Sequence, residues 1–139
     1  MKKLFTFLFA LACFAGMNAR EVYLVGDATS IGWNAGEALQ MTEVETDVFE
    51  WTGVLYATGA GQEGFKLLTQ KDWNPAIHPS VGGLVLNEVG SDVAKLPYSG
   101  DPDTKWTLSE TAEYKLRVTF RTEDVLVELE KVADVGVGI

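Results

Sequence analysis

The sequence has few of the residues that most catalytic and metal-binding sites need. It holds one cysteine, Cys13, and one histidine, His78, in 139 residues. Metal sites normally draw on several ligands, and His78 stands alone beside Pro79, so we interpret it as an ordinary surface or packing residue. Nucleophile motifs of the G-x-S-x-G type and Gly-rich phosphate loops that open a helix are also missing. The sequence therefore points to no cofactor and no metal.

Carboxylates are the remaining candidates for catalysis, because two of them suffice for glycoside hydrolysis. Glu43 and Glu45 would be such a pair. We interpret them instead as solvated side chains of a strand or turn, and a domain of this size has little room for a deep cleft. The sequence thus predicts a protein that is not an enzyme.

The first nineteen residues, MKKLFTFLFALACFAGMNA, have the pattern of a secretory signal peptide. Two lysines precede a short apolar run, and small residues follow it. The run is too short for a membrane-spanning helix. Cleavage after Ala19 would leave about 120 residues, the usual size of one domain. We therefore expect residues 1–19 to be removed and the protein to be exported, to the periplasm, the cell surface or the medium.

Cys13 lies inside this apolar run, after a stretch that loosely resembles a lipidation box. The usual leucine three positions before the cysteine is replaced by Ala10. We favour ordinary cleavage over lipidation, and a membrane is a partner only if Cys13 is lipidated. After cleavage the chain would have neither a disulfide nor a thiolate site.

Positive charge is scarce. The formal net charge is −9, and removal of Lys2 and Lys3 would take it to −11. The acidic residues are scattered, which is typical of a solvated surface. Because no basic stripe is present to attract phosphates, the sequence argues against nucleic acid and against sulfated polysaccharides. A neutral ligand would be indifferent to this charge.

Helical periodicity is missing as well, and alternation of apolar and polar residues dominates. The stretch 114–120 alternates, a short turn follows at 122–124, and 125–129 alternates again, which predicts a hairpin with one buried face. Further strands are expected in VYLVGD, FEWTGVL and GFKLLT, with weaker candidates in LQMTEV, GGLVL and KWTLS. Many short strands separated by Gly, Asn and Asp predict an all-β fold, an antiparallel β-sandwich of immunoglobulin-like type. We place this single domain at residues 20–132, followed by a tail at 133–139.

The four tryptophans divide by their surroundings. Trp51 is in step with Phe49 and Leu55, and Trp106 is in step with Leu108, so both are predicted in the core. Trp33 and Trp73 have no such apolar partners and lie among small and polar residues, in TSIGWNAGEA and QKDWNP. Each could pack under its own loop with its N–H satisfied at the rim. Because there are two of them, we favour display on the surface.

A displayed indole suits the flat apolar face of a sugar ring, while the sugar's hydroxyls need polar partners at the edge. Lysine donates hydrogen bonds to hydroxyls without requiring a charged ligand. Lys66 alternates with Phe65 and Leu67, so its ammonium should point away from the core. Lys71 precedes Trp73 by two residues and is a weaker second candidate. A Lys66 that is buried and paired, or a mostly buried Trp73, would place the binding surface elsewhere.

Four stretches, VYLVGDATSIGWN, FEWTGVL, FKLLTQKDW and DTKWTLSETAEYKLRVTF, resemble the starch-binding β-sandwich domains of the SusE/SusF family, surface proteins of Bacteroidetes that belong to a starch-utilisation system. The resemblance covers roughly residues 21–130. A more distant likeness links the order of loop tryptophan, strand lysine and turn tryptophan to glycogen-binding domains. The resemblance implies that Trp33 and Trp73 form an aromatic platform and that Lys66 is a polar contact.

The function implied is non-catalytic binding of an α-glucan such as starch, with other glycan-utilisation proteins as further partners. Members of the family usually carry several domains in tandem behind a lipidated cysteine, whereas one domain is expected here. Two alternatives remain open at this point: a different glycan, and a secreted or surface structural or adhesion domain whose loop tryptophans anchor a protein partner.

Overall fold

The architecture is a sandwich of two antiparallel sheets, as the alternation predicted. The computed structural model describes residues 20–57, 64–100 and 103–135. The expected signal peptide with Cys13, and the last four residues of the expected tail, lie outside this part. Within the described residues no helix is long and apolar enough to cross a membrane.

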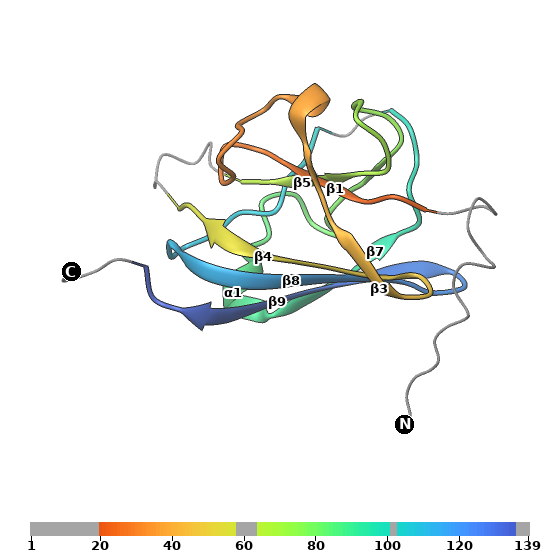
Figure 1. Cartoon of the computed structure of the whole chain (residues 1–139). Coiled ribbons are helices and arrows are strands. Elements are labelled where there is room, and N and C mark those ends of the chain that lie inside the picture. Colours follow the sequence, from red (N-terminus) through yellow and green to blue (C-terminus); the bar gives the residue numbers. More distant parts are fainter. Residues whose placement is uncertain (1–19, 58–63, 101–102, 136–139) are drawn as a thin grey trace.

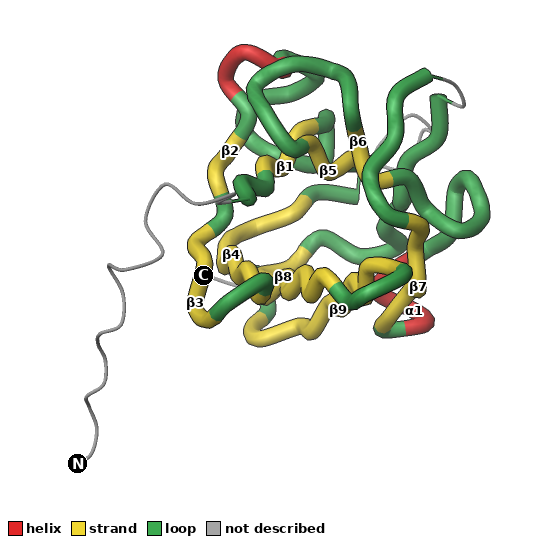
Figure 2. The backbone as a smooth tube through the Cα atoms, turned by 90° about the vertical axis from the view of Figure 1, so that its right-hand side faces the viewer, coloured by secondary structure: helices red, strands yellow, loops and turns green. Residues whose placement is uncertain are grey.

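The smaller sheet has four short strands in the order β2-β1-β5-β6. Their bounds are β1 Tyr23–Val25, β2 Leu39–Gln40, β5 Lys66–Leu68 and β6 Ala76–Ile77. In the register of β1 and β5, Val25 lies opposite Lys66. Figure 2 shows this sheet as the upper layer, with long loops gathered over it.

The larger sheet has five strands in the order β3-β4-β8-β9-β7. Their bounds are β3 Thr42–Glu45, β4 Val48–Leu55, β7 Ser91–Lys95, β8 Ala112–Phe120 and β9 Asp124–Ala133. The chain passes from the smaller sheet to the larger one at Met41, which is buried between β2 and β3 (Figure 1). The hairpin predicted from the alternation at 114–129 is confirmed as β8 and β9, and β9 continues to Ala133, the first residue of the expected tail.

The core lies between the two sheets because strict alternation turns one side of each long strand inward. Along β8 the side chains alternate between buried and half-buried from Ala112 to Phe120. Trp106 is fully buried and its ring stacks on Phe65 at a centroid distance of 5.6 Å. Trp106 is thus a core residue, as predicted. Trp51 packs against the core but is only half-buried, so its predicted place in the core is confirmed in part. It lies in the middle of β4, on the stretch from Glu50 to Val54 in which no residue is fully buried.

The weaker strand candidates had different outcomes. LQMTEV forms β2 and β3. GGLVL forms no strand: Leu86 begins the short helix α1, Leu86–Val89, which ends at Gly90 in a left-handed conformation. KWTLS contributes only isolated bridges, at Trp106 and Thr107. A three-residue helix, η3 Ala35–Glu37, lies in the β1–β2 loop.

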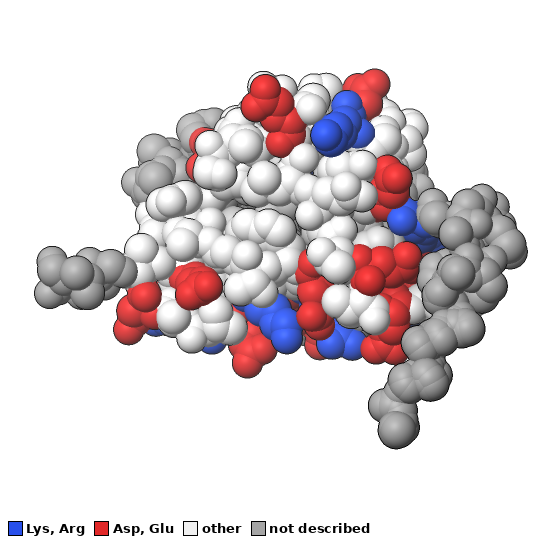
Figure 3. Space-filling model, viewed as in Figure 1, with Lys and Arg blue, Asp and Glu red and all other residues white. Residues whose placement is uncertain are grey.

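Charged side chains gather along the five-stranded sheet on the face shown in Figure 3, while the upper half of that face is mostly uncharged. On the outer side of this sheet Glu50 pairs with Arg117 at 2.9 Å and with Lys115 at 3.7 Å. Glu43 and Glu45 are exposed on β3, which agrees with their interpretation as solvated strand residues.

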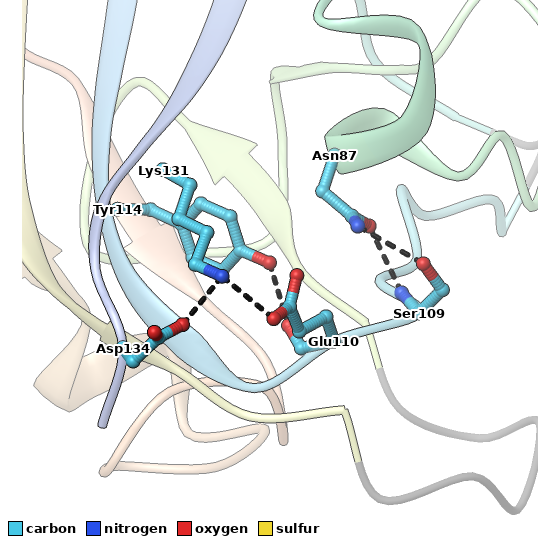
Figure 4. A network of polar contacts seen from close by, with 6 residues as sticks. All are labelled: Asn87, Ser109, Glu110, Tyr114, Lys131 and Asp134. Carbon is cyan, nitrogen blue, oxygen red and sulfur yellow. Dashed lines mark hydrogen bonds and ion pairs between the residues drawn. The ribbon is translucent and has the colours of Figure 1, made fainter. Parts of the chain in front are cut away.

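The end of β9 is tied to the loop that precedes β8 by a polar network (Figure 4). The Tyr114 hydroxyl donates to the backbone carbonyl of Glu110 at 2.6 Å. Lys131 pairs with Glu110 at 2.8 Å and with Asp134 at 2.5 Å, and these carboxylates raise the pKa of its ammonium group. The tyrosine contact resembles the corner that fixes the edge of many immunoglobulin-like sandwiches.

Candidate functional site

The outer face of the smaller sheet carries a second, smaller apolar cluster. It contains Tyr23, Val25, Leu68 and Ala76 from the strands and Ala35 and Ala38 from the β1–β2 loop. The loop is therefore folded down over the sheet by its own apolar residues. Lys66 lies on this same outer face, since Phe65 and Leu67 on either side of it belong to the main core.

Trp33 is held by the way the β1–β2 loop closes on itself. The Gly26 amide donates to the carbonyl of Gly32 at 2.9 Å, and the Thr29 hydroxyl donates to the carbonyl of Gly26 at 2.6 Å. Gly32 has φ +68°, in the left-handed region that glycine tolerates best. These contacts fix the backbone directly before Trp33, whose side chain remains 38% exposed.

Trp73 is presented by the turn between β5 and β6. The turn's polar side chains satisfy its own backbone: Gln70 donates to the carbonyls of Asp72, at 2.7 Å, and Pro75, at 3.0 Å. The Trp73 amide donates to the Asp72 carboxylate at 2.7 Å. Because the polar groups are used inside the turn, the indole is left outside it and is 40% exposed.

The fold brings the two loop tryptophans together. Their ring centroids lie 6.4 Å apart, and the ring planes are inclined by 36°. Aromatic pairs interact favourably at this separation. The two indoles therefore form one surface of adjacent, inclined faces, and neither is buried beneath its loop. We call Trp33, Trp73 and the ammonium of Lys66 the platform.

The ammonium of Lys66 lies close to both rings. Its ammonium nitrogen is 5.9 Å from the Trp33 ring centroid and 5.8 Å from that of Trp73, within the range of cation–π attraction. The ammonium also forms an ion pair with Asp103. As a result, the Lys66 side chain is only 13% exposed.

From the sequence, a buried and paired Lys66 was expected to rule out a binding surface here. That condition is met in part, because the Lys66 side chain is largely covered and is paired. Its ammonium is close to the two displayed tryptophans and paired with an exposed aspartate. Lys66 is therefore covered by surface groups and does not enter the core, unlike its neighbours Phe65 and Leu67. An ammonium group has three donors, so pairing with Asp103 leaves others for a ligand at the platform.

Asp103 is a member of the site that sequence reasoning missed. It lies in the loop between β7 and β8, far along the chain from Lys66, and only the tertiary structure brings the two together. Its side chain is 88% exposed. The hydrogen bond and positive charge of Lys66 lower the pKa of its carboxyl, so the group stays ionised.

Lys71 is exposed on the same turn as Trp73. Within the described part of the chain, no hydrogen bond, ion pair or ring contact joins it to the platform. Of the four predicted site residues, the structure therefore brings together Trp33, Lys66 and Trp73 and leaves Lys71 apart.

His78 lies behind the site and is not a surface residue. It is 6% exposed, and its ring packs on Tyr98 at a centroid distance of 4.5 Å. Neither ring nitrogen has a hydrogen-bond partner among the described residues. Burial, assisted by the charge of Lys66, lowers the pKa of His78, and the backbone of Tyr98 and the charge of Asp103 oppose it only in part. It is a neutral packing residue, consistent with the packing role considered for it.

The arrangement offers apolar faces with one cation and one anion at their edge. It suits a ligand that has an apolar face and hydroxyl groups. The described residues include no group of three or more His, Cys, Asp or Glu that could hold a metal ion.

Comparison with known families gives one match. The family model described as SusF/SusE starch-specific CBMs, that is, carbohydrate-binding modules, matches residues 21–126. Comparisons with curated proteins and with solved structures gave no significant match.

Proposed function

The chain belongs to the SusF/SusE family of starch-specific carbohydrate-binding modules, and from this membership we propose that its platform binds an α-glucan without cleaving it. The family implies starch binding and is typically non-catalytic. Its members are surface-exposed lipoproteins, which agrees with export of this chain.

The observation that carries the proposal is the pair of indoles at 6.4 Å. In an α-linked glucan successive sugar rings turn relative to one another, so the chain curves. Two aromatic faces inclined by 36° present such a curved chain with a face for each of two neighbouring rings. A flat, extended glycan would meet only one of the faces squarely.

Lys66 supplies the polar contact. Its ammonium lies 5.9 Å from the Trp33 ring centroid and 5.8 Å from that of Trp73, near enough to donate to a hydroxyl of a sugar stacked on either ring. The indoles partly shield it from water, and shielding strengthens a charge-assisted hydrogen bond. Lys71 remains a proposed secondary contact, which a ligand longer than the platform would reach.

Affinity electrophoresis in gels that contain amylopectin tests the proposal. We expect the wild type to be retarded and the variant W33A/W73A to migrate freely. The loss of a central aromatic contact weakens binding by about tenfold or more. The single variants Trp33→Phe and Trp73→Phe keep an aromatic face and are the matched controls. A gel that contains hydroxyethylcellulose controls for general stacking on glucose.

A wild type that amylopectin does not retard, or a double variant retarded as strongly as the wild type, contradicts the proposal. A glycan array with the wild type then identifies another glycan as ligand. If no glycan binds, the tryptophans anchor a protein partner instead. Release of reducing ends from soluble starch, which we do not expect, would reveal catalysis.

A further inference from the structure

Asp103 occupies an unusual place for an ion-paired residue. Its partner, Lys66, is 13% exposed, while Asp103 itself is 88% exposed. One carboxylate oxygen meets the ammonium, so most of the acceptor capacity of this side chain faces the solvent beside the two indoles. A carboxylate accepts hydrogen bonds at both oxygens, with about four sites in all.

The loop that carries Asp103 is attached to the same elements as the platform. The amide of Gly100 donates to the side-chain carbonyl of Asn74 at 3.1 Å, directly after Trp73. Tyr98 exchanges two backbone hydrogen bonds with Ala76, at 3.0 and 3.1 Å. Residues 98–100 are thus held against β6 and the Trp73 turn.

Most exposed ion pairs contribute little because both side chains stay mobile in water. Here the Lys66 side chain is largely covered and its ammonium is close to both indoles, so one end of the pair is already ordered. The lowered pKa of Asp103 keeps its carboxyl charged under mildly acidic conditions as well. The result is a charged carboxylate whose partner, Lys66, is close to both indoles.

We propose that Asp103 is a specificity-determining residue of the glycan site, whose carboxylate accepts a hydrogen bond from one hydroxyl of the stacked sugar while Lys66 donates to a neighbouring hydroxyl. This inference rests on the proposed function. A hydroxyl both donates and accepts, whereas an ammonium only donates and a carboxylate only accepts. The pair together therefore matches two neighbouring hydroxyls of a neutral sugar.

The pair also selects against charge. A sugar that carries a carboxylate would bring a second anion close to Asp103, where like charges repel. The site therefore prefers a neutral glucan to the same glucan oxidised at its primary hydroxyls. Without Asp103 the uncompensated Lys66 would attract the oxidised ligand.

Calorimetric titration with maltoheptaose tests the contact. We expect Asp103→Ala to weaken binding by about threefold to tenfold, because it removes one hydrogen bond to a charged group at an exposed site. Asp103→Asn should weaken binding by less. Glu88→Ala, which removes an exposed acid from α1, is the matched control and should bind as the wild type does. Thermal unfolding of each variant checks that the fold is kept.

A second arm uses maltoheptaose oxidised to carboxylates at its primary hydroxyls. The wild type should bind the neutral ligand more tightly, and Asp103→Asn should reduce that preference by about threefold or more. If Asp103 only fixed the loop, its substitution would weaken the binding of both ligands alike. An unchanged ratio of the two affinities therefore contradicts the proposal. Unchanged or tighter binding of maltoheptaose by Asp103→Ala contradicts it too, because it would show that Asp103 merely covers Lys66.

Glucan binding by the platform and the role of Asp103 are distinguished by different outcomes. A wild type that binds neither maltoheptaose nor amylopectin overturns the proposed function, and this inference with it. A wild type that binds, loses binding in W33A/W73A and is indifferent to Asp103→Ala overturns the role of Asp103 alone.

Discussion

The ammonium of Lys66 lies 5.8 Å from the centre of the Trp73 ring, although the two residues are on different elements, a strand and the turn that follows it. A cation over an indole face is attracted by about 0.5 to 2 kcal/mol, depending on how far it is desolvated. This contact brings the turn's tryptophan and the strand's lysine to one surface of the molecule. Several properties of the protein follow from it and from the packing behind it.

Replacement of Lys66 by methionine should separate binding from stability. The variant Lys66→Met keeps an unbranched side chain beneath the rings but loses every donor. We expect its affinity for maltoheptaose to fall by about fivefold to twentyfold, as for a lost charge-assisted hydrogen bond. Lys71→Met is the matched control and should lose less than about twofold in affinity, because no hydrogen bond, ion pair or ring contact among the described residues joins Lys71 to the platform. Equal losses in the two variants would show that the general positive charge, and not the position of Lys66, matters.

Asp92 should be the most sensitive carboxylate for folding. It is 7% exposed and accepts hydrogen bonds from the amide and hydroxyl of Ser80 and from the indole N–H of Trp106, the last at 2.9 Å. Asp92→Ala leaves these donors without a partner and should lower the free energy of unfolding by about 3 kcal/mol. Urea unfolding measures this loss. Asp134→Ala, at an exposed ion pair with Lys131, should leave the free energy of unfolding nearly unchanged.

The pH dependence of stability should reveal His78. Its pKa is lowered in the folded state, chiefly by burial, so below pH 6.5 the unfolded chain takes up a proton that the folded chain resists. Stability therefore falls as pH decreases from the ordinary histidine pKa toward the lower pKa of the folded protein. His78→Phe should remove this part of the slope in urea unfolding between about pH 7 and pH 5. If the free energy of unfolding of the variant depends on pH as steeply as that of the wild type, other groups cause the pH dependence.

Gly26 should be required for the loop that holds Trp33. Its φ is +143°, and a Cβ at this position would collide with the backbone carbonyl of Gly64. Gly26→Ala should lower the free energy of unfolding by about 2 kcal/mol or more and displace the start of the loop, so that glucan binding weakens as well. Gly36→Ala is the matched control in the same loop, because its Cβ would meet only the Asn34 side chain at 3.5 Å. If Gly26→Ala is as stable as Gly36→Ala, the loop does not depend on this close approach.

The fold was predictable from the sequence where strands are long and one face is buried. The alternation at 114–129 gave the β8–β9 hairpin because a period of two leaves no other element that buries the same residues. Short apolar stretches carried less information. GGLVL has apolar residues without a sustained period, and in the structure it becomes a bridge and the start of α1.

The site was predictable in part for a similar reason. Parity along β5 placed Lys66 outside the core because Phe65 and Leu67 are apolar on either side of it. The absence of apolar partners around Trp33 and Trp73 indicated display. The sequence did not reveal Asp103, since no local pattern distinguishes it from the other scattered acids, nor could it show that Lys71 lies apart from the platform.

The sequence by itself thus determined the all-β sandwich, the inward and outward sides of its long strands and the exposure of two tryptophans. These properties follow from local alternation, which is written along the chain. Only the tertiary structure decided that Trp33 and Trp73 meet at 6.4 Å over one lysine and that Asp103 is the partner of that lysine. The reason is that these contacts join three separate loops, and their distances depend on how the β1–β2 loop packs on the outer face of the smaller sheet.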